Sequence, residues 1–377
     1  MKIIHITGEF PPYSTGGLGR YVYELTQCQA RTDNKVAVLL NRGSEIESVQ
    51  PQPAAFLTEY HEAVLNSDTH KKYSSGIIDP ESLAHTVPDD ITSPDIIHVH
   101  DWYGVLPALR LQHTTDAQVV YSAHLPLRAG FTYSGHAVSK RVKMRIESMG
   151  LRNADLVIAP TSSTANLLKR EYDVSSHRIH VIPNGVDTSK FTPGDEPTMP
   201  NRIFAVGRMT EQKGFHYLID AIDYLDDSAD LEVILAGDGP ERDSLISWTE
   251  KNGLTDRIAF PGRVSEKRLL REYRRAIVTA VPSVYETFGL VCLESMACGT
   301  PVVGFEAKGI QSIVQDMVNG RLARPHISKE LAMRLQYMLK NTDEQKAMSK
   351  AALQTAKDYD WNTISREVVS VYADLSN

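Results

Sequence analysis

The sequence has few cysteines and no long apolar run. Only three of its 377 residues are cysteines, which is too few for a disulfide framework, and their spacing does not fit a zinc site. No apolar run approaches the roughly 18 residues that a membrane-spanning helix needs. Met1 and Lys2 lead straight into the apolar run at residues 3–6, which is too short and polar for a signal peptide. We therefore expect a soluble cytoplasmic protein without membrane contact.

An excess of positive charge is also missing. Lysine and arginine total 40, and aspartate and glutamate total 47, which gives a net charge of −7. Proteins dedicated to nucleic-acid binding normally carry a basic excess, so no nucleic-acid partner is expected. Apolar residues make up 42% of the chain and charged residues 23%, a mixture typical of soluble globular proteins rather than disordered, collagen-like or coiled-coil chains. The length of 377 residues favours two domains.

Short apolar runs alternate with helical stretches along most of the chain. Runs rich in Val and Ile that alternate with helical patterns are typical of buried parallel strands in βαβ units. The sequence therefore predicts an α/β fold with two doubly wound, Rossmann-like domains, although residues 44–95 show little periodicity. We expect strands at 3–6, 36–40, 95–99, 119–122, 156–159, 179–182, 203–207, 231–236, 277–281 and 301–305.

A proline-rich break without periodicity separates the two sets of predicted strands. It predicts a linker at residues 183–200, between an N-terminal domain of residues 1–182 and a C-terminal domain of residues 201–360. The amphipathic segment 361–377 is expected to form a helix that packs back toward the N-terminal domain. Doubly wound sheets bind ligands at the carboxyl ends of their strands, so two such domains are expected to face a central cleft.

Two adjacent glycines, Gly16 and Gly17, precede the first predicted helix. At a helix N-terminus they let backbone N–H groups approach a phosphate, which the helix dipole also favours. Their spacing differs from that of the dinucleotide-binding fingerprint. A flexible turn that needs a positive φ angle explains the pair equally well, so both interpretations stay open.

Two cations, Arg208 and Lys213, follow the first strand of the predicted C-terminal domain. Arginine offers a planar fork and lysine a compact point charge, and together they suit a diphosphate. The alternative is a solvated basic loop that pairs with Glu211, because surface charges are common.

The stretch at residues 282–301 is the most informative part of the sequence. Glu294 is the only charged residue between Thr287 and Phe305, and a buried carboxylate needs hydrogen-bond donors. Two ribose hydroxyls or backbone amides would supply these donors to Glu294. Glu286 lies in the turn before the same helix, where side chains reach a ligand. The helix is opened by the amides of Gly289 and Leu290, which are expected to hold a phosphate oxygen.

Histidines stand at the ends of two predicted strands of the N-terminal half. His98 and His100 alternate onto one face, as metal ligands do, but no third ligand is placed by spacing, so we expect no metal site. His124 follows the strand at 119–122 and is a candidate hydrogen-bond donor at the ligand site. A core histidine bonded to the backbone is the alternative for His124.

Taken together, these residues resemble a known family. The motifs are Gly-Gly-Leu-Gly at 16–19, Gly-Arg at 207–208 with Lys-Gly at 213–214, Gly-Asp-Gly-Pro at 237–240, and Glu286 and Glu294 within a Pro-Ser-x-Tyr-Glu-x-Phe-Gly-Leu segment. In this order they resemble the retaining nucleotide-sugar glycosyltransferases of family 4, which have the two-domain GT-B fold and are related to glycogen and starch synthases. The first half is also similar to glycogen synthases in its His-Asp-Trp motif at 100–102, but it has Ser14 where they usually have a lysine.

The resemblance implies a role for each candidate residue. The sugar donor's diphosphate would be bound by Gly16, Gly17, Arg208, Lys213 and the amides of Gly289 and Leu290. The nucleoside would be bound by Glu294 through its ribose and bordered by Arg263 and Val264 at its base. The transferred sugar would lie beside Glu286 and His124. Because two cations already face the diphosphate, no metal and no cofactor are expected.

The implied reaction is transfer of a hexosyl group from a nucleotide-diphospho sugar, most commonly UDP-linked in this family, with retention of configuration. The acceptor would be a soluble hydroxyl compound, such as a natural-product core, a small polyol or an oligosaccharide. It would lie near Asp101, Trp102, the loop at 128–136 and the region at 44–95. Two alternatives within the fold are α-glucan elongation, as in glycogen or starch synthases, and sugar-nucleotide epimerisation. A non-catalytic sugar-nucleotide-binding protein is a third. Closure of the two domains around the sugar donor would exclude water.

Overall fold

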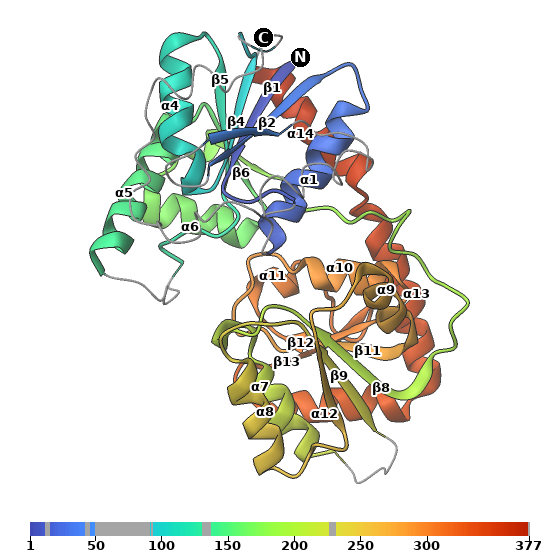
Figure 1. Ribbon diagram of the computed structural model, residues 1–377. Helices are drawn as coiled ribbons and strands as arrows, with labels where there is room; N and C mark the ends of the chain where they lie inside the picture. The colour runs from blue at the N-terminus through green and yellow to red at the C-terminus, as the bar shows by residue number, and fades with distance from the viewer. Residues whose placement is uncertain are drawn as a thin grey trace, which may run out of the picture. The chain divides into compact units, whose positions relative to one another are not determined.

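The computed structural model describes residues 1–11, 16–41, 46–49, 91, 93–129, 137–225 and 231–375. The chain forms two compact α/β units (Figure 1). Unit 1 consists of Met1–Pro183 together with Trp361–Asn377, and unit 2 consists of Asn184–Asp360. None of the described helices is long and apolar enough to cross a membrane.

Unit 1 contains a seven-stranded sheet in the order β3-β2-β1-β4-β5-β6-β7. All neighbouring strands are parallel except β3, which runs antiparallel to β2 at the edge. The alternation of apolar strands with helices produces this arrangement, because each crossover helix covers one face of a parallel sheet. The strands are β1 (Lys2–Thr7), β2 (Lys35–Asn41), β3 (Ile46–Val49), β4 (Ile96–His100), β5 (Gln118–Ser122), β6 (Leu156–Ala159) and β7 (Ile179–Val181).

The helices of unit 1 include one from the far end of the chain. Helix α14 (Trp361–Leu375) packs on α1 (Gly17–Ala30) (Figure 1). The two helices bury a shared apolar cluster that contains Tyr21, Leu25 and Tyr372. The other helical segments of unit 1 are η2 (Trp102–Gly104), α4 (Val105–Thr114), α5 (Ala137–Asn153), α6 (Ser162–Tyr172) and η3 (Ser176–Arg178).

Unit 2 contains a fully parallel six-stranded sheet in the order β10-β9-β8-β11-β12-β13. The strands are β8 (Met199–Val206), β9 (Glu232–Ala236), β10 (Ile258–Gly262), β11 (Ala276–Val281), β12 (Val302–Phe305) and β13 (Gly320–Ala323). The helical segments are η4 (Glu211–Lys213), α7 (Phe215–Asp223), α8 (Arg242–Lys251), α9 (Glu266–Arg275), α10 (Leu290–Ala297), α11 (Lys308–Gln311), α12 (Ser328–Lys340) and α13 (Thr342–Asp358).

The predicted α/β class with two doubly wound sheets is confirmed. Three strands were not predicted, and each has a local reason. Strand β10 contains Pro261 and Gly262, which are unusual inside a sheet. Strand β13 begins with Gly320 and is only four residues long. Strand β3 lies in the stretch without clear periodicity.

The proline-rich segment that was expected to be a linker packs on unit 2. Val186 and Phe191 are buried in its apolar core, and Val186 forms an isolated bridge with Asp360. Residues 184–198 form no helix or extended strand, but their apolar side chains still pack, and β8 begins within the expected linker at Met199. Residues 184–200 are therefore an ordered part of unit 2.

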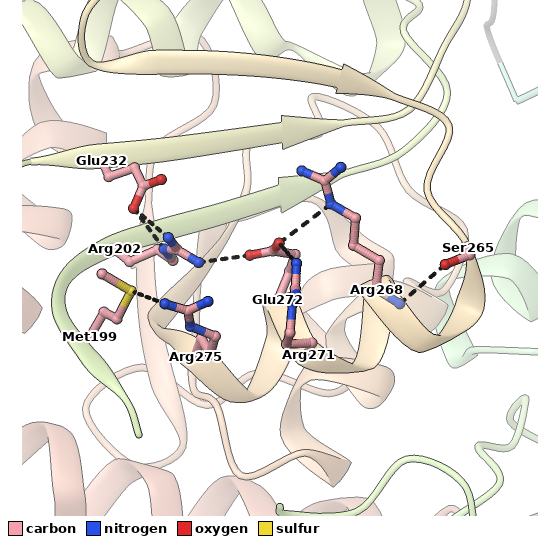
Figure 2. A network of polar contacts seen from close by, with 8 residues as sticks. All are labelled: Met199, Arg202, Glu232, Ser265, Arg268, Arg271, Glu272 and Arg275. Carbon is pink, nitrogen blue, oxygen red and sulfur yellow. Dashed lines mark hydrogen bonds and ion pairs between the residues drawn. The ribbon is translucent and has the colours of Figure 1, made fainter. Parts of the chain in front are cut away.

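Helix α9 is attached to the sheet of unit 2 by a charged network (Figure 2). The buried carboxylate of Glu272 accepts a hydrogen bond from Arg202 of β8 at 2.9 Å, and it lies 3.5 Å from Arg268 and 3.6 Å from Arg271. Arg202 also donates to Glu232 of β9, at 2.9 Å from its Nε atom. Glu272 therefore attaches this helix to Arg202 of β8, and Arg268 and Arg271 of the same helix balance the charge of Glu272.

Candidate functional site

Each sheet has one point at which the strand order reverses. In unit 1 this point lies between β1 and β4, and in unit 2 it lies between β8 and β11. The loops that leave two such strands go to opposite faces of the sheet, which opens a crevice at their carboxyl ends. The candidate residues that follow β1, β4, β8 and β11 are therefore positioned at the two locations where a doubly wound sheet binds ligands.

The main candidate site of unit 2 is an ion pair at this crevice. The Nζ atom of Lys213, after β8, lies 2.6 Å from the Oε2 atom of Glu286, after β11. The side chains are 23% and 13% exposed, so both remain accessible. The sequence predicted each residue separately, and the structure joins them. Lys213 thus pairs with Glu286. The alternative, a solvated basic loop that pairs with Glu211, is therefore wrong for Lys213.

Backbone contacts hold the two loops of this ion pair together. The N–H group of Val284 donates to the carbonyl oxygen of Gln212 at 3.0 Å, and the Gln212 side chain donates to the carbonyl of Tyr285 at 3.2 Å. Gly214 has a φ angle of +62°, and a Cβ atom there would lie 2.2 Å from the carbonyl oxygen of Pro282. Only glycine fits this position, which explains the Lys-Gly pair.

Arg208 follows Gly207 after β8, in the same segment that carries Lys213. Its side chain is exposed and has no ion-pair or hydrogen-bond partner among the residues that the structure describes. The loop after β9 fixes its backbone, because the N–H group of Met209 donates to the carbonyl of Asp238 at 2.8 Å. A Cβ atom at Gly237 would lie 1.9 Å from the carbonyl oxygen of Gly207. The Gly-Asp-Gly-Pro motif therefore supports the position of Arg208.

Helix α10 starts where the sequence predicted a phosphate-binding N-terminus. Gly289 is its N-cap residue, and the first helical residue is Leu290. One turn later, Glu294 is buried, and its Oε2 atom accepts a hydrogen bond of 2.8 Å from the hydroxyl of Tyr273. Tyr273 of α9 was not predicted as part of the site. The sequence did contain a signal for its burial, because this tyrosine has apolar neighbours on a helix that is otherwise charged.

Arg263 and Val264 follow β10, at the edge of the sheet. Arg263 is highly exposed, and its Nε atom lies 3.8 Å from the Oδ2 atom of Asp238. Val264 packs on the apolar core of unit 2. Strand β9 separates β10 from β8, so this pair is more distant from the switch point than Lys213. Their predicted contact with a base remains a prediction.

In unit 1, Gly16 and Gly17 lie at the start of α1 as predicted. Gly16 is the N-cap residue with a φ angle of −163°, which is extended backbone that any residue adopts. The interpretation as a turn needing a positive φ angle is therefore wrong for Gly16. Both glycines are exposed, and the predicted contact with a phosphate remains a prediction. Residues 12–15, which include Ser14, lie outside the described residues.

Asp101, at the end of β4, holds the turn that carries His124. Its Oδ1 atom accepts hydrogen bonds from the backbone N–H groups of His124 at 2.7 Å and Leu125 at 3.2 Å. Burial raises the pKa of this carboxyl group to about 7, although the two hydrogen bonds oppose the increase. The φ angle of Asp101 is +55°, which costs energy in a non-glycine residue. Asp101 is therefore a structural support for His124, and its predicted contact with an acceptor remains a prediction.

Trp102, the other residue predicted on the acceptor side, is partly buried and surrounded by side chains. Its ring stacks on that of Tyr103 at a centroid distance of 4.3 Å, and the Nζ atom of Lys143 lies 5.0 Å from the ring centroid. A flat aromatic face of this kind also suits the apolar face of a sugar. Most of the loop at 128–136 lies outside the described residues.

The structure supplies the third histidine that the sequence could not place. His5 of β1 is paired in register with His98 of β4, so it lies beside His98 and His100, with one ring nitrogen of each within 4.8 Å of the others. Sequence spacing describes a single strand and cannot show a neighbour from another strand. The statement that no third side chain is available is therefore corrected.

Hydrogen bonds, however, occupy every ring nitrogen of this cluster. His5 bonds to Gln29 at 2.7 Å and to His100 at 2.9 Å. His100 bonds in addition to His124 at 3.1 Å. His98 bonds to Ser122 at 2.7 Å and Tyr372 at 2.6 Å. No nitrogen lone pair is left for a metal ion unless one of these bonds breaks, so the cluster fits a hydrogen-bond network better than a metal site.

Burial keeps these histidines neutral. It lowers the pKa of His5 to about 4 and that of His124 to about 3, and it lowers the pKa values of His98 and His100 well below their usual range. A charged imidazole would lose its hydration in this environment, which the hydrogen bonds do not replace. At neutral pH, His124 is therefore an uncharged group at the end of a buried network.

Family models match both halves of the chain. The model described as Glycosyltransferase Family 4 matches residues 15–190, and the model described as Glycosyl transferases group 1 matches residues 187–355. Among curated relatives, the glycogen synthase of Mycobacterium tuberculosis is 29% identical over 99% of this chain and 94% of its own length. The D-inositol 3-phosphate glycosyltransferase of Xylanimonas cellulosilytica is 27% identical over 96% of this chain and 92% of its own.

Solved structures share the fold. The sucrose-phosphate synthase of Thermosynechococcus elongatus superposes with a TM-score of 0.78, at 23% identity over 99% of this chain and 98% of that one. HepE of Anabaena, solved in complex with UDP-glucose, superposes with a TM-score of 0.74, at 21% identity over 99% of this chain and 100% of that one. The two family matches together span residues 15–355 and agree with the motifs at the two switch points. The chain belongs to the GT-B glycosyltransferases and is similar to those of family 4.

Proposed function

We propose that this glycosyltransferase moves a hexosyl group from a UDP-linked sugar to a hydroxyl group of a soluble acceptor, with retention of configuration. The observation that carries the proposal is the group of cations at the switch point of unit 2. Arg208 is exposed without a side-chain partner among the described residues, and Lys213 is accessible beside Glu286. A diphosphate is the ligand whose charge these two side chains complement.

The cations also suit the chemistry of the transfer. Negative charge grows on the diphosphate as its bond to the sugar breaks, and preorganised positive groups stabilise that state. Lys213 is held in place by Glu286 at 2.6 Å before any ligand arrives. The amides of Gly289 and Leu290 at the start of α10 add the favourable end of a helix dipole. The site thus stabilises the leaving group without a proton donor.

Glu286 would lie beside the transferred sugar. In the transition state the sugar ring carries positive charge, which a nearby carboxylate stabilises. In a front-face reaction the bond between the anomeric carbon and the phosphate oxygen breaks while the acceptor oxygen attacks from the same side. The acceptor's proton passes to the departing phosphate oxygen, so no enzymic base is required. The alternative is that Glu286 is the nucleophile of a covalent intermediate.

The nucleoside would be bound by Glu294, with its ribose hydroxyls as hydrogen-bond donors. One oxygen of Glu294 is already oriented by Tyr273 at 2.8 Å, which fixes the side chain. Arg263 and Val264 would border the base. The complex of HepE with UDP-glucose, a protein of the same fold, supports a uridine nucleotide as the first candidate.

The reaction is proposed to need no metal ion. Arg208, Lys213 and the start of α10 supply the positive charge that a divalent cation supplies elsewhere. We expect EDTA to leave turnover unchanged. Loss of turnover in EDTA with recovery on adding Mg²⁺ would disprove this part of the proposal.

The acceptor is proposed to be a natural-product core, a small polyol or an oligosaccharide that contacts Trp102 and His124. Elongation of an α-glucan is a second candidate, which is favoured by 29% identity to a glycogen synthase over 99% of this chain. The sequence difference at Ser14 separates the chain from typical glycogen synthases. A series of lengthened products on a maltooligosaccharide primer would support the second candidate, and a single glycosylated product would support the first.

A ligand panel tests the proposal directly. UDP, GDP, ADP and their common glucose, galactose and N-acetylglucosamine conjugates would be tested by thermal shift and then, with pooled acceptors, for release of the nucleoside diphosphate. A ligand at 100 times its Kd stabilises the folded protein by about 2.7 kcal/mol. Stabilisation by one nucleotide and acceptor-dependent release are expected. Conversion of the sugar without an acceptor would instead indicate an epimerase, and no response to any conjugate would contradict the proposal.

A further inference from the structure

A continuous line of hydrogen bonds runs from the core of unit 1 to His124. We call Gln29, His5, His100 and His124 the histidine chain. The Oε1 atom of Gln29 lies 2.7 Å from the Nε2 atom of His5. The Nδ1 atom of His5 lies 2.9 Å from the Nε2 atom of His100, and the Nδ1 atom of His100 lies 3.1 Å from the Nε2 atom of His124. In each link, the Nε2 atom of a histidine ring faces an oxygen or nitrogen atom of the preceding residue in the histidine chain.

The first link gives the chain a direction. The amide of Gln29 is oriented with its oxygen toward His5 and its nitrogen toward Tyr372. In this orientation the oxygen is only an acceptor, so the Nε2 atom of His5 carries hydrogen. A neutral imidazole has a single N–H group, so the Nδ1 atom of His5 then accepts from the N–H group of His100. The same argument requires that the Nε2 atom of His124 carries hydrogen and that its Nδ1 atom does not. This Nδ1 atom has no partner among the described residues, which leaves it available as an acceptor.

A second arm starts at the same glutamine and does not reach His124. The amide nitrogen of Gln29 donates to the hydroxyl of Tyr372 at 3.4 Å. That hydroxyl lies 2.6 Å from Nδ1 of His98, and Nε2 of His98 lies 2.7 Å from the hydroxyl of Ser122. Because the two ends of one amide face the two arms, the orientation of Gln29 sets the direction of both.

Burial preserves this direction. Gln29, His5, His98 and His100 are all completely inaccessible to solvent, so no water competes for their ring nitrogens. While Gln29 keeps this orientation, one reversed link would place two donors or two acceptors opposite each other, and an unsatisfied buried polar group is costly. His124 itself lies against the ring of Tyr21, at a centroid distance of 4.4 Å, and its backbone is held by Asp101 at 2.7 Å. Its ring position and its tautomer are thus both determined by neighbours.

We propose that Gln29, His5 and His100 are positioning residues that hold His124 as one tautomer, with its Nδ1 atom ready to accept a hydrogen bond from a hydroxyl group of the sugar substrate. The role in substrate binding rests on the proposed function, whereas the choice of tautomer does not. His124 is thus a hydrogen-bond acceptor toward the substrate, whereas its sequence position alone indicated a donor.

The tautomer is tested first, without any substrate. The full chain labelled with ¹⁵N at histidine would be studied by long-range ¹H–¹⁵N NMR at neutral pH, with His124→Gln to assign the signals. We expect one tautomer of His124, with hydrogen on Nε2. In Gln29→Met, which keeps a side chain of similar length but removes the amide, both tautomers should appear. His98→Phe is the matched control, because both ring hydrogen bonds of His98 belong to the second arm and the phenyl ring keeps its packing on His5 and His100. It should leave His124 unchanged.

The role in the reaction is tested by kinetics on the same variants. If a nucleotide sugar is turned over, His5→Phe and Gln29→Met should lower kcat about tenfold, the effect of one neutral hydrogen bond of about 1.4 kcal/mol. The KM for the sugar donor should stay within about twofold, because the diphosphate contacts are unchanged. His98→Phe should retain the wild-type kcat. Should His5→Phe fail to fold, Gln29→Met answers the same question.

Three results would overturn the proposal. Hydrogen on Nδ1 of His124 in the wild type would contradict the direction of the chain, and a single unchanged tautomer in Gln29→Met would show that the chain does not set it. A tautomer that changes in Gln29→Met while kcat remains that of the control would contradict the contact with the substrate hydroxyl. The absence of turnover in the wild type with every nucleotide sugar would contradict the proposed function, and the NMR result would still decide the tautomer.

Discussion

At the residue scale, the pairing of Lys213 with Glu286 links the proposed diphosphate binding to the proposed chemistry. In the structure, each side chain balances the charge of the other at 2.6 Å. In the proposed reaction, Lys213 would gain a second anion when the diphosphate binds, and Glu286 would remain at the site with its negative charge. An ion pair that is partly exposed contributes little to folding. This ion pair therefore matters mainly because it fixes the positions of the Lys213 and Glu286 side chains.

Lys213→Ala is expected to lower turnover by about a hundredfold or more, because it removes a positive group that faces the charge developing in the transition state. The free energy of unfolding should change by less than about 1 kcal/mol. Steady-state kinetics and urea unfolding measure the two effects. Lys251→Ala, at the end of α8, is the matched control and should behave as the wild type. Equal turnover in both variants would remove Lys213 from the catalytic group.

A second residue-scale prediction concerns Glu147, a buried carboxyl group that supports the segment after His124. It accepts hydrogen bonds from the N–H group of Leu127 at 3.0 Å and from the hydroxyl of Tyr172. Burial raises the pKa of Glu147 to about 8, although the bond from Tyr172 opposes the increase. The folded state therefore keeps a proton that the unfolded state releases above pH 4.5. Between about pH 4.5 and pH 8, this group makes the protein less stable as the pH rises.

Glu147→Gln removes that titration. Relative to the wild type, the variant should become more stable as the pH increases from 5 to 8, by up to about 1.4 kcal/mol per pH unit. Urea unfolding at pH 5 and pH 8 measures the difference. Glu171→Gln, on the exposed side of α6, should follow the wild type at both pH values. Parallel pH dependence of Glu147→Gln and the wild type would contradict the raised pKa.

At the scale of elements, the charged network of Figure 2 explains how α9 stays on the sheet. Glu272 is buried and contacts Arg202, which is itself buried. Breaking such a pair leaves a buried charge without compensation, which costs about 3 kcal/mol or more. The same helix carries Tyr273, whose hydroxyl orients Glu294. The network therefore also fixes a residue of the proposed nucleotide site.

Glu272→Gln is expected to destabilise unit 2 by about 3 kcal/mol, because Arg202 would keep only its second partner. Glu232→Gln is the matched control, since Glu232 contacts the same arginine from a side chain that is 41% exposed, and its effect should stay below about 1 kcal/mol. Thermal and urea unfolding measure both. Equal losses in the two variants would contradict the role given to burial.

Elements with strong periodicity could be predicted from the sequence. Ile364, Val368 and Tyr372 recur on one face, and they lie in the helix α14, which begins at the expected residue 361 and ends at Leu375. Strand β10 could not be recognised because Pro261 and Gly262 disrupt its pattern. Contacts between elements that are far apart in the sequence could not be predicted either. The pairing of Lys213 with Glu286 depends on the order of β8 and β11, and the position of His5 beside His98 depends on strand register.

At the scale of the whole molecule, the chain crosses from unit 1 to unit 2 and back. Unit 1 is completed only by residues that follow unit 2 in the sequence. Trp361, Ile364, Val368 and Tyr372 of α14 are all buried in one apolar cluster with α1. Tyr372 also bonds to His98 and Gln29. The C-terminal helix is therefore part of the core of unit 1 and of the second arm of the hydrogen-bond network that starts at Gln29.

Truncation after Asp360 is expected to unfold unit 1 while unit 2 stays folded. Burial of four large side chains contributes about 2 kcal/mol each, which together approaches the 5–15 kcal/mol that typically stabilise a domain. Hydrogen exchange on the truncated chain should show protection in β8–β13 and loss of protection in β1–β7. The matched control is removal of residues 376–377 alone, which lie beyond α14, and it should leave both units protected. Protection of β1 and β4 in the truncated chain would show that unit 1 folds without its C-terminal helix, and loss of protection in β8 and β11 would show that unit 2 depends on unit 1.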